Sequence, residues 1–204
     1  MTKAAFLEGD FVNLRELRVT DAELTFRWRQ TQRAKFLNSG AVTLEQQAAW
    51  IAGRPVSEYN FIIELKSGHP VGMLSLIGID KGNRRGEPAR FLIGDESAAK
   101  GVPVAVEAMK LLYRLAFDQL GLVRVWGIVA ANNHLMFKWH LFMGMKEEGR
   151  LRSHLCLAGQ FQDAIIIGLL VDEYRKITLP RMEVLICAAN PRSDNFKNHK
   201  EISC

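Results

Sequence analysis

The sequence is poor in cysteine and has no long apolar run. Its 204 residues include three cysteines, Cys156, Cys187 and Cys204, whose wide spacing excludes a disulfide framework. No apolar stretch approaches the roughly 20 residues of a membrane-spanning helix, and the N-terminus lacks the basic patch and apolar core of a secretory signal. These absences favour a cytoplasmic protein with reduced cysteines and no membrane partner.

The sequence also has no long run of lysine and arginine, although its formal net charge is +5. This pattern disfavours nucleic acid and membrane surfaces as partners. The basic residues instead recur near predicted turns: Arg27, Arg29, Arg33, Arg84, Arg85, Arg90 and Lys100. They either form ordinary solvated faces or attract a small polyanion, and the pattern alone leaves both interpretations open. No spacing of histidine and cysteine matches a set of metal ligands, so no metal is expected.

Hydrophobic residues make up 48% of the chain, which is enough for one full core, and no low-complexity tract interrupts it. We expect residues 1–174 to form a single domain and residues 175–204 to form a C-terminal extension. Within the extension, residues 182–188 are compatible with one added strand. Pro180 and Pro191 favour a loosely held, flexible end.

The first half of the chain predicts three strands and two helices. The strands cover residues 11–19, 60–65 and 71–79, where apolar residues alternate or cluster between turn residues. The helices cover residues 20–28 and 43–53, and each begins at a threonine that can cap its first turn.

The second half contains the most informative unit: a strand over residues 89–94, a helix over residues 100–121 and a strand over residues 123–130. Parallel strands joined in this way need a right-handed crossover, which brings the helix N-terminus to the carboxyl edge of the sheet. The unpaired N–H groups and partial positive charge of a helix start suit a pyrophosphate. We therefore expect an anion site at residues 101–105.

A short helix that opens at Asn133 and a hairpin of residues 146–157 and 161–171 complete the pattern. Together these elements predict an α/β protein of the α+β type. Its central sheet is expected to be mixed and mostly antiparallel, with about seven strands and about four helices. The parallel pair is expected in the unit of residues 89–130.

The order and spacing of these elements resemble the GNAT superfamily of N-acetyltransferases over residues 11–170. In that family a turn of Arg or Gln, two residues, Gly, one residue, and Gly or Ala wraps the diphosphate of acetyl-CoA. Lys100, Pro103 and Ala105 occupy the matching positions, and Pro103 departs from the pattern because proline has no amide hydrogen. The resemblance implies acetyl-CoA as co-substrate, held by Phe91, Leu92, Ile93, Lys100, Gly101, Val102, Pro103, Val104, Ala105 and Asn133. The first three of these would pair with the pantetheine arm and polarise the acyl carbonyl.

Acetyl transfer to an amine needs positioning rather than a protein nucleophile, because a thioester is already activated. The family's usual general acid is a tyrosine, and counting back five residues from Met145 places His140 at its position. The resemblance implies that His140 protonates the departing thiolate, since histidine can donate a proton near neutral pH. Glu87 matches a glutamate near the acceptor amine and would accept its proton. The alternatives are that His140 only packs and that Glu87 only pairs with a neighbouring arginine.

The end of the first predicted helix resembles the family's acceptor wall, which implies that Trp28, Arg29 and Glu87 contact the amine. Their surroundings are similar to the branch that acetylates amino-sugars carried on nucleotides, and the basic charge suits such an anionic small molecule. The strand from Gly149 is similar to ribosomal-protein (Rim-type) N-terminal acetyltransferases, which stay an alternative. A non-catalytic acyl-CoA-binding module is a third hypothesis, because of Pro103 and the missing tyrosine. A homodimer is left open.

Overall fold

The computed structural model describes residues 6–38 and 40–189, which form one eight-stranded sheet in the order β1-β2-β3-β4-β5-β6-β8-β7. Among these strands β5 and β6 are parallel and the other neighbouring pairs are antiparallel, as expected from the sequence. The short strand β1 is an addition to the expected set. The strands are β1 (Phe6–Glu8), β2 (Val12–Glu16), β3 (Tyr59–Leu65), β4 (Pro70–Asp80), β5 (Arg85–Ile93), β6 (Arg124–Ala130), β7 (Lys146–Leu157) and β8 (Gln160–Leu170).

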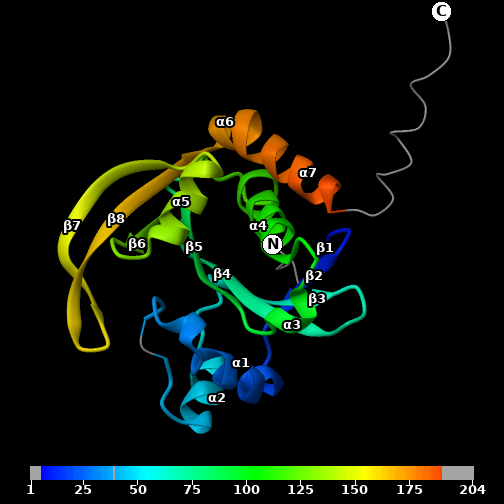
Figure 1. The fold of residues 1–204 in the computed structure, drawn as a ribbon, viewed down its shortest axis with the longest axis vertical. Helices are drawn as coiled ribbons and strands as arrows, with labels where there is room; N and C mark the ends of the chain where they lie inside the picture. The colour runs from blue at the N-terminus through cyan, green and yellow to red at the C-terminus, as the bar shows by residue number, and fades with distance from the viewer. Residues whose placement is uncertain (1–5, 39, 190–204) are drawn as a thin grey trace, which may run out of the picture.

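Helices cover both faces of the sheet. Figure 1 shows α4 and α7 over one face and α1 and α2 over the opposite face, while the β7–β8 hairpin extends from the body. None of the described helices is long and apolar enough to cross a membrane. The helices are α1 (Ala22–Arg29), α2 (Leu44–Ala52), α3 (Glu96–Ala99), α4 (Val104–Arg114), α5 (His134–Phe142), α6 (Val171–Glu173) and α7 (Leu179–Ala188), with π-turns η3 (Leu115–Gln119) and η4 (Tyr174–Thr178).

Alternating side chains of the central strands build a core on each face. In β3, Phe61 and Ile63 belong to the larger cluster, which includes much of α4. Ile62 lies between them in sequence and belongs to the smaller cluster on the side of α1 and α2, together with Trp28. This division follows from the strand geometry, because successive side chains of a strand point to opposite faces.

The C-terminal segment corrects one expectation. Residues 182–188 form part of helix α7 and not an added strand. Tyr174, Met182 and Ile186 are buried in the larger core cluster, so this segment is part of the packed domain up to residue 189. Apolar residues four apart share one face of a helix, and Pro180 is accommodated because it lies in the first turn. The expected flexible end from residue 190 lies outside the described residues.

The helix expected over residues 100–121 is also corrected. A separate short helix, α3, is capped by Asp95, whose side chain accepts a hydrogen bond from the Ala98 amide. Gly101 then has a φ of +78°, which favours glycine and ends that turn. Helix α4 begins only at Val104, with Pro103 as its N-cap. The chain therefore passes from β5 through the short helix α3 and the turn at Gly101 before α4 begins.

Candidate active site

Strands β5 and β6 pair for only two residues before they separate. Their parallel register joins Arg85 to Arg124 and Gly86 to Val125, and β5 and β6 do not pair further among the described residues. A cavity of about 670 Å³ is lined by both strands beyond this point and by residues of α1, α2, α4 and α5. The unpaired edge of β5 leaves backbone groups available to an extended ligand, because a strand edge can pair with a peptide-like chain.

A bulge in β5 shapes the wall of this cavity. Met73 pairs with Leu92 and Ser75 with Ala89, so Arg90 and Phe91 together oppose the single residue between them on β4. Arg90 adopts a φ of 55°, which is unusual for a residue with a side chain. A bulge re-aims the side chains of its strand, and here both Arg90 and Phe91 line the cavity.

Arg90 is held by a network on its own sheet face. Its Nη1 donates to Glu58 Oε2 at 2.7 Å and to Asn60 Oδ1 at 2.9 Å. Ser75 Oγ donates to the same Asn60 oxygen at 2.7 Å, and the guanidinium carbon lies 5.2 Å from the centre of the Trp50 ring. The side chain of Arg90 is therefore fixed in position before any ligand binds.

Glu87 lines the cavity as its only glutamate or aspartate among the described residues. Burial raises the pKa of its carboxyl group, while the charge of Arg90 acts in the opposite direction. Glu87 and His140 line the same cavity, and the catalytic roles expected of them stay predictions. A half-buried carboxylate of raised pKa is suited to accept a proton.

The pKa of His140 differs from the ordinary value for histidine. It lies on α5 and lines the cavity, but burial lowers the pKa of its imidazole to about 4. Desolvation disfavours the charged ring, so His140 is neutral near pH 7. Proton transfer from His140 to the departing thiolate stays a prediction, and a neutral ring can also donate one hydrogen bond from its N–H group.

The three residues expected along the pantetheine arm point in different directions. Phe91 lines the cavity, whereas Leu92 is 3% exposed and packs in the core cluster beside α1 and α2. Ile93 packs against the larger core cluster. Two of the three side chains therefore support the sheet, and only their backbone groups remain for hydrogen bonds to a ligand.

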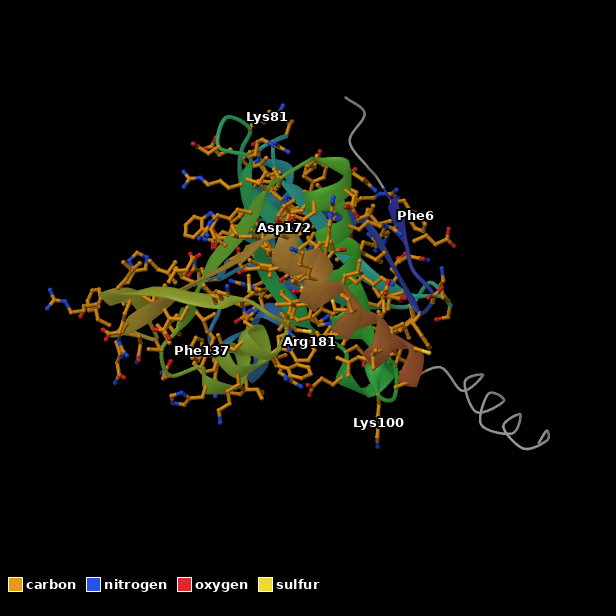
Figure 2. The ribbon with its side chains drawn as sticks, turned by 90° about the horizontal axis from the view of Figure 1, so that it is seen from above. Phe6, Lys81, Lys100, Phe137, Asp172 and Arg181 are labelled. Carbon is orange, nitrogen blue, oxygen red and sulfur yellow. The ribbon has the colours of Figure 1, made fainter. Side chains whose placement is uncertain are left out.

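The expected anion site lies at the start of α4. The Val104 amide donates to the Val102 carbonyl at 2.8 Å, and the Glu107 amide donates to the Pro103 carbonyl at 3.0 Å. The amides of Ala105 and Val106, between them, have no acceptor among the described residues, as is usual in a first helical turn. Lys100 is exposed and extends away from the body (Figure 2). These residues do not line the cavity itself.

Asn133 caps a helix as well as lining the cavity. Its side-chain oxygen accepts a hydrogen bond of 3.3 Å from the Met136 amide and so caps α5. Asn133 also lines the cavity, next to the end of β6. Capping and a ligand contact are compatible, because an amide side chain has donors as well as an acceptor.

The two residues expected in the acceptor wall separate in the structure. Trp28 is 6% exposed and does not line the cavity. Its ring packs against Gly94, where a Cβ would lie 2.2 Å from the indole. Arg29 does line the cavity, and its Nη2 donates to the Asn38 carbonyl. Burial lowers the pKa of the Arg29 guanidinium, and the nearby charge of Arg90 lowers it further.

The sequence placed Arg90 only among the basic residues that could attract a polyanion, and it gave Trp50 no role in the site. Both line the cavity, and they lie against each other although they come from β5 and α2. A usable signal exists for Arg90, because it is a charged residue inside an otherwise apolar run. No comparable signal marks Trp50, whose position depends on how α2 packs.

Metal ligands were not expected from the sequence. In residues 6–38 and 40–189, no three side chains of His, Cys, Asp or Glu are grouped so that they could hold a metal ion. Cys156 and Cys187 are exposed free thiols. That the protein binds no metal stays a prediction.

Comparisons with known proteins place the chain in a family. Residues 12–146 match the family described as Acetyltransferase (GNAT) domain. Spermidine N(1)-acetyltransferase of Escherichia coli (strain K12) is 29% identical over 118 residues, which cover 58% of this chain and 61% of that protein. YdaF of Bacillus subtilis (strain 168), named as a candidate ribosomal N-acetyltransferase, is 33% identical over 110 residues, which cover 54% of this chain and 58% of YdaF. The chain thus matches about three fifths of the length of these relatives.

Solved structures extend the likeness to nearly the whole chain. A candidate acetyltransferase superposes with a TM-score of 0.77 at 25% identity, covering 96% of this chain and 99% of that one. A GCN5-related N-acetyltransferase from Brucella melitensis has a TM-score of 0.75 at 22% identity, covering 94% and 88%, and shows the shared fold. The family match spans more than half of the chain and contains the diverging strands and the cavity residues of β5 and α5. The chain belongs to the GNAT acetyltransferase family.

Proposed function

We propose that the protein transfers the acetyl group of acetyl-CoA to the primary amine of a small molecule. The cavity between the diverging strands β5 and β6 carries this proposal, because it brings Glu87, Asn133 and His140 to one place. The open edge of β5 supports binding of the pantetheine arm, and the free amide of Ala105 at the start of α4 supports binding of the diphosphate.

The residues divide the chemical work. The acetyl thioester is already activated, so the protein holds the amine against the carbonyl carbon and removes its proton. Glu87 accepts that proton, directly or through a water molecule. His140 is neutral and donates a hydrogen bond to the departing sulfur, and the thiolate takes its proton from water.

The charge of the cavity favours an anionic acceptor, such as an amino-sugar carried on a nucleotide. Arg29, Arg33 and Arg90 line it together with Glu87. Arg33 pairs with Glu96 and Arg90 pairs with Glu58, whereas Arg29 has no carboxylate partner among the described residues. The spermidine enzyme of Escherichia coli is a relative, but a polyamine would meet the Arg29 guanidinium here, which no carboxylate of the described residues neutralises. Like charges in a partly buried site repel strongly, so the cavity disfavours a polycation.

Ribosomal-protein acetylation is the second candidate, and the similarity to YdaF favours it. A screen for free CoA separates these functions, with acetyl-CoA and an amino-sugar nucleotide, spermidine, or a peptide that begins with Ser or Ala. We expect CoA release with the amino-sugar nucleotide. Release with the peptides alone supports the second candidate. Thermal stabilisation by acetyl-CoA without release from any amine contradicts the proposed activity and supports a non-catalytic acyl-CoA-binding module.

His140→Phe tests the catalytic role within the same screen. Loss of one hydrogen bond to a charged sulfur is expected to lower kcat about tenfold, with acetyl-CoA affinity nearly unchanged. An unchanged kcat would make His140 a packing residue.

A further inference from the structure

We propose that Arg29 and Arg90 form an oxyanion-binding subsite for the acceptor, so that the amine substrate carries a carboxylate or phosphate group of its own. This inference rests on the proposed function and names the substrate class of the same cavity. The two arginines come from α1 and from the β5 bulge, and both line the cavity together with Glu87.

The first argument is the charge balance. Arg90 has a carboxylate partner, because its Nη1 donates to Glu58 at 2.7 Å. Arg29 donates to the neutral carbonyl of Asn38, and no carboxylate of the described residues pairs with it. A half-buried guanidinium without an anion is unfavourable, since charges leave water at a cost unless they are paired. The pair therefore has an excess positive charge that a ligand oxyanion would balance.

The second argument is preorganisation. Glu58, Asn60 and the ring of Trp50 fix the Arg90 guanidinium while using only its Nη1 for hydrogen bonds among the described residues. On the other side, a Cβ on Gly40 would lie 3.0 Å from Arg29 Nε, so the loop before α2 is packed against that side chain. Each guanidinium has five N–H donors, and most of them stay available for a planar or tetrahedral oxyanion.

The third argument is that the same cavity holds a separate group for the amine. Glu87 is a carboxylate that can bind the incoming ammonium group, whereas the two arginines repel it. A molecule with an amine at one end and an oxyanion at the other would thus bind in one orientation, with its amine at Glu87.

Calorimetry with short amines of equal length tests the subsite without any need for turnover. The probes are aminopropyl phosphate, aminobutyrate, aminopropanol and diaminopropane, which end in a phosphate, a carboxylate, a neutral group and a cation. We expect one or both anionic amines to bind at least about tenfold more tightly than aminopropanol, and diaminopropane to bind most weakly. The tighter of the two anions identifies which oxyanion the subsite prefers.

Variants assign the preference to the two residues. We expect Arg29→Gln and Arg90→Gln each to reduce the anion preference about tenfold. Arg29 donates to a backbone carbonyl and Arg90 to Glu58 and Asn60 in the parent protein. Arg27→Gln is the matched control, because Arg27 lies on the same helix with a 68% exposed side chain that pairs with Glu23. It should leave the preference unchanged.

Equal binding of the anionic and neutral probes, tighter binding of the cation, or no binding of any probe would overturn the subsite. So would an Arg29→Gln variant that keeps the full preference while it still binds acetyl-CoA. Failure of the proposed function has a different signature: the anionic probes bind with the expected preference, but none of them releases CoA from acetyl-CoA.

Discussion

The carboxylate of Glu107 on α4 accepts a hydrogen bond of 2.7 Å from the amide of Val12 at the start of β2. The same carboxylate accepts the amides of Asp10 and Phe11, each at 2.7 Å, and Glu107 is 2% exposed. This single side chain thus joins the β1–β2 turn to the helix whose N-terminus is proposed to bind the cofactor. The position of α4 depends on a contact between segments far apart in the chain.

Glu107→Leu is expected to lower the free energy of unfolding by about 3 kcal/mol or more, because buried amides lose a charged acceptor. Glu107→Gln keeps one acceptor oxygen and is expected to cost less. Urea denaturation measures both, with Glu23→Gln as control because that side chain is 70% exposed. A loss below about 1 kcal/mol for the leucine variant would show that water replaces the carboxylate.

Gly94→Ala is expected to destabilise the protein by at least about 2 kcal/mol, because the new Cβ would lie 2.2 Å from the Trp28 ring. Gly149→Ala is the control, since a Cβ there would meet its nearest neighbour at 3.7 Å, an ordinary contact. The midpoint of chemical denaturation reports both changes. Trp28→Leu in the Gly94→Ala background should recover part of the loss, and a purely additive double variant would contradict the clash.

Pro103→Gly is expected to change acetyl-CoA affinity less than about threefold, because Pro103 is the N-cap and the free amides of the first turn belong to Ala105 and Val106. Ala105→Pro removes one of these amides and is tolerated in a first turn, so it should weaken binding about tenfold. Calorimetry with acetyl-CoA compares the two variants. Tighter binding after Pro103→Gly would instead show that the missing proline donor limits affinity.

The ionisation of His140 predicts a loss of stability in acid. Its folded pKa of about 4 lies below the ordinary value of 6.5, so the unfolded chain binds the proton more readily. The stabilising contribution of the neutral ring is complete above pH 6.5 and is lost as the pH falls towards 4, by at most about 3 kcal/mol. His140→Phe should remove this pH dependence of unfolding, and the exposed His134→Phe should not. Equal slopes for the parent and His140→Phe would contradict the depressed pKa.

The pH profile of turnover tests Glu87 and its neighbour. Burial raises the pKa of Glu87 and Arg90 lowers it, so activity that needs the carboxylate is present above that pKa and is lost as the pH falls through it. Arg90→Gln should move this acid limb to higher pH at saturating acceptor, and Arg27→Gln should leave it in place. Glu87→Gln should abolish the limb and lower kcat about a hundredfold. A limb that persists in Glu87→Gln would belong to another group.

Local patterns determined the order of the elements. The capping threonine of α2 is an example: the Thr43 side chain accepts the Gln46 amide at 3.3 Å, as its spacing predicts. The strand of residues 60–65, expected between turn residues, likewise corresponds to β3 (Tyr59–Leu65). Such features are readable because the interacting groups are within a few residues of one another.

Tertiary packing decided the site. Residues 182–188 became a helix because Met182 and Ile186 are buried in the same core as Tyr174. The neutral state of His140 comes from desolvation by surrounding atoms, which no local spacing records. Arg29 and Arg90 share one cavity only because α1 packs near the β5 bulge. The sequence by itself determined the family and the strands that carry the chemistry, and the tertiary structure decided the charges and pKa values of the cavity, because these depend on groups distant in the chain.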